Sequence, residues 1–143
     1  MRTLKRSLLN FGLTTSAVAV LVMGVYTIGP WLETKFLPVY SRFEIMQIEP
    51  YGEGQTRAIF KFTKYRQCEP QGFAWYTGEL GAAFRQLRVK VESTGSVPSR
   101  PLGVQMTSPY VIDATPAQVK DATFAEIFST CHPFWTTRSV IYP

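Results

Sequence analysis

The sequence predicts a single N-terminal transmembrane helix followed by an all-β domain, a small antiparallel β-sandwich of immunoglobulin-like type. Three observations predict this fold. A window without charged residues lies near the N-terminus, polar and apolar residues alternate with a period of two in the rest of the chain, and Pro and Gly separate the alternating runs. A small antiparallel β-barrel is the alternative for the second part of the chain.

The uncharged window extends from Ser7 to Leu32. A bilayer core requires about 20 such residues in a helix, and a helix satisfies its own backbone groups in lipid, so we expect residues 7–32 to form a transmembrane helix. Gly29 and Pro30 are expected to end it. A cleaved signal peptide and the core helix of a soluble protein are the alternatives, and both are disfavoured by the length of the window.

The flanking charges predict the orientation of this helix. Segment 1–6 is a basic tail that contains Arg2, Lys5 and Arg6 and no acid. Because basic flanks remain cytoplasmic, we expect this tail in the cytoplasm and the rest of the chain on the exported side of the membrane. Tyr26 and Trp31 are then placed at the outer interface, where aromatic residues are enriched.

One face of the predicted helix is rich in small residues. These are Gly12, Thr15, Ser16 and Ala19. Small side chains let two transmembrane helices approach closely, so this is a candidate helix-packing face. The alternative is that small residues are simply common in such helices.

Residues 33–42 are predicted to be a short membrane-proximal connection, too apolar for a flexible linker. The β-sandwich domain is then 43–143. Alternation predicts half-buried strands at 43–48, 57–63, 73–76, 87–92, 105–112, 124–130 and 137–142. Thr115 as a cap and Pro116 at the first helical position predict one short helix near 115–121.

Cys68 and Cys131 are the two cysteines of the chain. In an oxidising compartment such a pair is most simply one disulfide, which would close a loop of about 60 residues and contribute about 4 kcal/mol. Two free thiols, one of them catalytic beside His132, are the alternative. Trp75 lies between the cysteines as in immunoglobulin domains, but so close to the first that a staple between loop ends is also compatible.

The chain has few residues that could support catalysis or metal binding. His132 is its one histidine, so a histidine-rich metal site and a four-ligand zinc cluster are excluded. The acids are scattered, and the paired glycines lack the strand–loop–helix context of a phosphate site. The net charge of +5 comes mostly from the N-terminal tail. We therefore expect no catalytic residue, metal, cofactor or nucleic-acid partner.

Aromatic residues are concentrated in and beside several predicted elements. The candidates for an interaction surface are Trp31, Trp75, Tyr76, Phe134, Trp135 and Tyr142. Aromatic side chains are enriched in interfaces and in cores alike, so packing in the core is the alternative for each of them.

Four short motifs, taken in order after the predicted anchor, carry a resemblance. They are Arg66-Gln67-Cys68-Glu69, Ala74-Trp75-Tyr76, Ser99-Arg100-Pro101 and the run from Cys131 to Arg138. In these the chain resembles short uncharacterised single-pass membrane proteins of proteobacteria and their phages. The resemblance implies a bacterial or phage setting and no particular activity. In such a setting the helix is expected in the inner membrane and the β-sandwich domain in the periplasm.

Together these features predict a non-catalytic, membrane-anchored accessory or structural subunit. Its helix and its exported domain would pack on a larger membrane protein complex, so its expected partners are the lipid bilayer and other integral membrane subunits. The alternative is a free-standing periplasmic or surface binding module that serves adhesion, exclusion or sensing.

Overall fold

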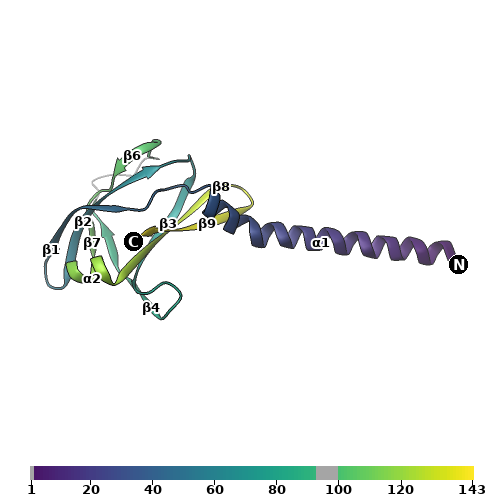
Figure 1. Ribbon diagram of the computed structural model, residues 1–143, viewed down its shortest axis with the longest axis horizontal. Coiled ribbons are helices and arrows are strands. Elements are labelled where there is room, and N and C mark those ends of the chain that lie inside the picture. Colours follow the sequence, from purple (N-terminus) through teal and green to yellow (C-terminus); the bar gives the residue numbers. More distant parts are fainter. Residues whose placement is uncertain (1, 93–99) are drawn as a thin grey trace.

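The computed structural model describes residues 2–92 and 100–143, and the side chains of 11–92 and 100–143. One long helix, α1 (Arg2–Phe36), projects from a β-rich domain and meets it at the C-terminal end of the helix (Figure 1). Within Phe11–Phe36, the most apolar 18 residues have a mean hydropathy of 1.8, and none of them is buried by the domain. The helix is therefore long and apolar enough to span a membrane.

The expectation that Gly29 and Pro30 end this helix is wrong, because α1 continues to Phe36 with Pro30 inside it. Proline removes one helical hydrogen bond, but the turn that follows is held by other contacts. The Thr34 hydroxyl donates to the Pro30 carbonyl at 2.9 Å and lies 3.1 Å from the Arg138 carbonyl of the domain. The first part of the predicted connection is thus a docked helical turn.

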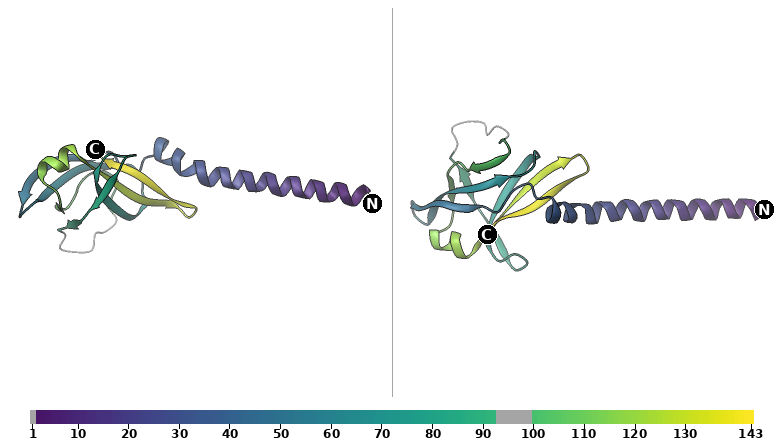
Figure 2. Two further views of the ribbon diagram at one scale, coloured as in Figure 1. Left: turned by 90° about the horizontal axis from the view of Figure 1, so that it is seen from below. Right: turned by 45° about the horizontal axis from the view of Figure 1, so that its top comes forward.

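The domain consists of two antiparallel sheets, which do not close into a barrel (Figure 2). The first sheet contains β1 (Glu44–Tyr51), β2 (Gln55–Lys64), β7 (Tyr110–Ile112) and β5 (Val89–Val91) in that order, and β6 (Gly103–Met106) also pairs with β2. The second sheet has the order β4 (Phe84–Leu87), β3 (Glu69–Gly78), β8 (Thr123–His132) and β9 (Trp135–Tyr142).

Two of the predicted strands are each divided in the structure. The run 87–92 contains the end of β4 and all of β5, which belong to different sheets, so the chain crosses between the sheets near Arg88. The run 105–112 is broken between β6 and β7, where Pro109 has no backbone donor. The other five predicted runs fall on observed strands, and α2 (Pro116–Asp121) begins after Thr115 with the expected cap.

The hydrophobic core lies between the two sheets. Strand β2 alternates buried and half-buried residues along its whole length, as predicted for a strand with one face in the core. Phe60 of this strand is fully buried and packs on Trp75 of β3, with ring centroids 5.2 Å apart.

Trp75 and Tyr142 are core residues and not part of an exposed surface, which corrects two of the six candidate interface aromatics. Their exposed fractions are 1% and 5%. The Trp75 indole donates to Thr123 Oγ1 at 3.0 Å, and the Tyr142 hydroxyl donates to the Val119 carbonyl at 3.0 Å. Their polar atoms have partners inside the domain, as buried aromatic residues require.

Candidate functional site: the junction between α1 and the β8–β9 hairpin

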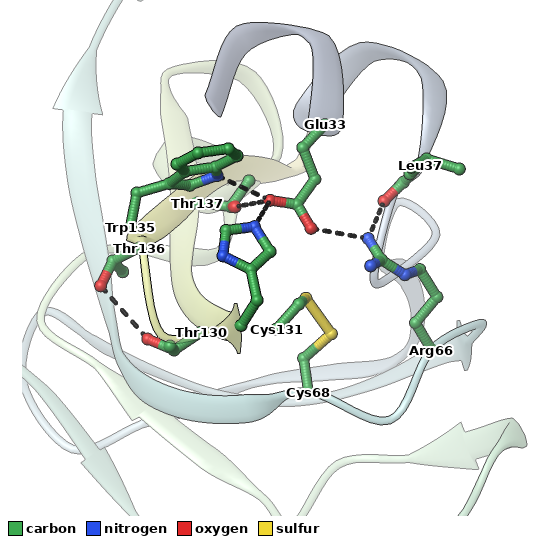
Figure 3. The surroundings of a disulfide bond; sticks show 10 residues. Glu33, Leu37, Arg66, Cys68, Thr130, Cys131, Trp135, Thr136 and Thr137 are labelled. Atoms are coloured by element: carbon green, nitrogen blue, oxygen red, sulfur yellow. Dashed lines mark hydrogen bonds and ion pairs between the residues drawn. A yellow bond between two sulfur atoms is a disulfide. The ribbon is translucent and has the colours of Figure 1, made fainter. Parts of the chain in front are cut away.

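Cys68 and Cys131 form a disulfide, as the cysteine pair predicted (Figure 3). Cys68 directly precedes β3 and Cys131 lies near the end of β8, and these two strands are neighbours in the second sheet, where Glu69 pairs with Thr130. The bond therefore joins adjacent strands of one sheet and does not connect the two sheets. Of the two arrangements that were compatible with the sequence, the structure excludes a bond that pins the two sheets together.

A buried carboxylate lies beside this disulfide. Glu33, in the last turns of α1, is only 6% exposed. Its Oε2 accepts hydrogen bonds from the Thr137 hydroxyl at 2.7 Å and from the Trp135 indole at 2.9 Å. Both donors belong to β9, so this carboxylate fixes the end of the helix to the β8–β9 hairpin (Figure 3).

The other carboxylate oxygen of Glu33 forms an ion pair. Arg66 Nη1 donates to Oε1 at 2.8 Å and also to the Leu37 carbonyl at 3.0 Å (Figure 3). Leu37 is the residue after α1, so the guanidinium holds both a side chain and the C-terminal backbone of the helix. A cation at this end of a helix also interacts favourably with the helix dipole.

His132 completes the shell around Glu33. Its Nε2 lies 3.2 Å from Glu33 Oε2, while its Nδ1 accepts from the Phe134 backbone N–H at 3.3 Å. Because Nδ1 is the acceptor of that hydrogen bond, we assign the ring proton to Nε2, which donates to Glu33. Both ring nitrogens are therefore engaged, which matches a structural role in the turn.

These contacts make Glu33 a strong acid. Burial by itself raises the pKa of a carboxyl group. The hydrogen bonds from Thr137, Arg66, Trp135 and His132 outweigh burial and lower the pKa of Glu33 from its ordinary value of 4.5 to about 2. The carboxyl group lies just beyond the predicted span 7–32 and is covered by the folded domain. At neutral pH the carboxyl group is therefore ionised, and hydrogen-bond donors of the protein stabilise its negative charge in place of water.

Trp135 also packs directly on the helix backbone. A Cβ added at Gly29 would lie 2.7 Å from the Trp135 ring, and the ring of Tyr26 meets the same indole edge-on at a centroid distance of 6.1 Å. The lack of a side chain at Gly29 thus makes room for the indole. We call Tyr26, Gly29, Glu33, Arg66, His132, Trp135 and Thr137 the junction.

The structure places the remaining candidate residues outside this cluster. Gly12, Thr15, Ser16 and Ala19 are exposed on α1, where Thr15 and Ala19 line a shallow apolar groove. Trp31 and Phe134 are 57% and 63% exposed, on the helix and in the hairpin turn. Tyr76 is half-buried and stacks on Phe124, with ring centroids 5.0 Å apart.

Glu33, Arg66 and Gly29 were not among the site residues predicted from the sequence. One signal was available for Glu33, since an acid directly after an apolar span must find partners or lie in water. Within the described residues no group of three or more His, Cys, Asp and Glu side chains is arranged to hold a metal ion. Comparisons with protein-family models, curated proteins and solved structures find no match to this chain.

Proposed function

We propose that this chain is a single-pass accessory subunit of a larger membrane protein complex, with its N-terminus in the cytoplasm and its β domain in the periplasm of a bacterium. The observation that carries the proposal is the junction, in which the buried carboxylate of Glu33 joins the helix to the β8–β9 hairpin. We further propose that the domain is a variant of the immunoglobulin-like sandwich whose disulfide lies within one sheet.

A fixed junction favours a subunit over a tethered module for a physical reason. A module that reaches for a distant ligand gains from a flexible linker. A subunit whose helix and domain contact one partner together gains from holding both surfaces in a fixed relative orientation, because less freedom is lost on binding. The four donors around Glu33 supply such a restraint.

The free surface of α1 supports a partner in the membrane. The most apolar 18 residues of α1 include none that the domain buries, and Thr15 and Ala19 line a groove on this helix. The Thr15 hydroxyl donates to the Phe11 carbonyl at 2.8 Å within the helix, so the groove can meet an apolar helix without leaving that hydroxyl unsatisfied. We assign this face to a helix of the partner.

The exposed aromatics support a domain that rests on the bilayer. Because Trp135 contacts Tyr26 and Gly29, the hairpin turn lies next to the part of α1 that would leave the lipid. Phe134 in this turn and Trp31 on the helix are then at headgroup level, where aromatic side chains are favoured.

Co-purification from membranes tests this proposal. The tagged chain is extracted in a mild detergent, and its partners are identified and counted by mass spectrometry. Ala19→Leu should remove the partner, because the leucine would fill the groove that Ala19 lines, whereas Ala17→Leu, on the other side of the helix, should leave recovery unchanged. A chain that runs alone from wild-type membranes would instead support a free-standing binding module.

A further inference from the structure

A cavity of about 490 Å³ lies at one end of the sandwich and is lined by residues of both sheets. Its walls are largely aromatic, formed by Tyr40, Phe43, Phe62, Phe73 and Tyr110. This volume is within the range of sites that hold small organic ligands. The cavity is separate from the junction, since none of the junction residues lines it.

Two pairs of stacked aromatic rings form part of the cavity wall. Phe73 of β3 stacks on Tyr110 of β7, with ring centroids 5.2 Å apart and an interplanar angle of 12°. Phe43 stacks on Phe62 of β2 at 4.7 Å and 20°. Stacked rings of this kind provide flat apolar surfaces, which suit a planar ring or an extended chain.

Lys64 brings an uncompensated charge to this cavity. Its exposed fraction is 2%, and its Nζ donates to the Arg100 carbonyl at 2.9 Å. It belongs to none of the ion pairs formed among the described residues. Burial lowers the pKa of Lys64. An ammonium group has three donors, and a buried cation without an ion-pair partner is costly, so this position favours an anionic group.

The other polar groups of the lining strengthen this reading. The Arg100 guanidinium lies 5.5 Å from the centre of the Phe62 ring and adds a second cation. Burial raises the pKa of both Tyr40 and Tyr110, so the two phenols remain protonated. Glu69 is the one acid in the lining, but it is exposed and forms no ion pair with Lys64.

We propose that this cavity binds a small organic carboxylate, with the carboxylate group at Lys64 and Arg100 and an apolar body between the stacked aromatic walls. The same chemistry occurs in free aryl carboxylates and in acyl carboxylates released from lipids. The site goes beyond the proposed subunit function and does not depend on it, because none of the residues that line the cavity belongs to α1.

The test uses the full chain in lipid nanodiscs and the probe 4-(trifluoromethyl)phenylacetate, followed by ¹⁹F NMR. The matched neutral probe is 4-(trifluoromethyl)phenylacetamide. Nanodiscs without protein correct for uptake by the lipid. We expect the carboxylate to bind at least about tenfold more tightly than the amide, since charge-assisted hydrogen bonds supply this difference.

Variants assign the binding to the proposed residues. Lys64→Met keeps the apolar stem and should weaken carboxylate binding about tenfold or more, while leaving binding of the amide unchanged. Arg100→Gln is a second, independent variant, with a smaller loss in the same direction. Lys61→Met, on the other face of β2, is the control and should bind as wild type does.

Competition with octanoate and with phenylacetate then separates the two sources of the ligand. Stronger displacement by octanoate indicates an acyl ligand, and stronger displacement by phenylacetate indicates an aryl ligand. Equal binding of carboxylate and amide to the wild type, or full carboxylate binding by folded Lys64→Met, would overturn the proposal. So would the failure of both competitors to displace the probe.

Discussion

Replacing Glu33 by Gln should detach the end of α1 from the domain and destabilise the domain. An amide has the shape of the carboxylate but no charge, and its NH₂ group would face donors that now bind an oxygen. Two of these donors, the Thr137 hydroxyl and the Trp135 indole, lie within 3 Å of the same oxygen, Oε2. The Arg66 cation would lose its counter-ion.

The magnitude follows from the structure in two ways. Removing one partner of a buried ion pair typically costs about 3–5 kcal/mol. This figure applies to Glu33 because its side chain is only 6% exposed. Independently, a pKa lowered from 4.5 to about 2 corresponds to roughly 3 kcal/mol. Because docking occurs only in the folded state, its loss appears in the free energy of unfolding, and we expect the midpoint to fall by about 10–20 °C.

The assay is thermal unfolding of the full chain in nanodiscs, followed by tryptophan fluorescence, which includes that of the buried Trp75. Glu44→Gln is the matched control, because Glu44 is exposed and has no ion pair among the described residues. It should unfold within about 0.5 kcal/mol of wild type. An unchanged midpoint for Glu33→Gln, or an equal loss for both variants, would refute the assignment of Glu33 as the restraint.

Three further predictions concern the same region. Gly29→Ala should displace the indole and lower the free energy of unfolding by about 1–2 kcal/mol. Gly24→Ala, with open space around it, should be neutral or stabilising, and calorimetry compares the two variants. Because the pKa of Glu33 is depressed, the contribution of its carboxylate to the stability of the fold is complete above about pH 4.5 and is lost as the pH falls toward 2. The unfolding midpoints of wild type and Glu33→Gln should therefore converge over that interval. A difference between the midpoints that stays constant with pH would contradict this. The double variant Cys68→Ser/Cys131→Ser should lose about 2–5 kcal/mol, and thiol labelling of the denatured wild type should require prior reduction.

Features with a local cause could be predicted from the sequence. The apolar span needs only its own composition to be identified. The α2 cap depends on Thr115 and Gln118, three residues apart, whose side chains and backbone groups bond reciprocally. The pairing of Cys68 with Cys131 could be predicted because the chain has two cysteines and one disulfide is the simplest arrangement for such a pair.

Features that depend on distant contacts could not be predicted in this way. Pro30 is a helix breaker by local rules, yet the turn after it is held by Arg138, more than a hundred residues away in the chain. The run from Leu87 to Val91 alternates as one strand would, but its two ends pair with different sheets. Period-two alternation specifies which side chains are buried and not which sheet buries them.

The disulfide and the junction are adjacent along the chain, and this links oxidation to docking. Arg66 lies just before Cys68, and His132 directly follows Cys131. The covalent bond therefore holds together the two chain segments that supply two of the four donors to Glu33. In the reduced protein these segments would still be next to the strand pairing of Glu69 with Thr130, which is at the end of the ladder, where strands open most easily. The helix would then be held mainly by Trp135 and Thr137, so the full restraint on α1 requires the disulfide.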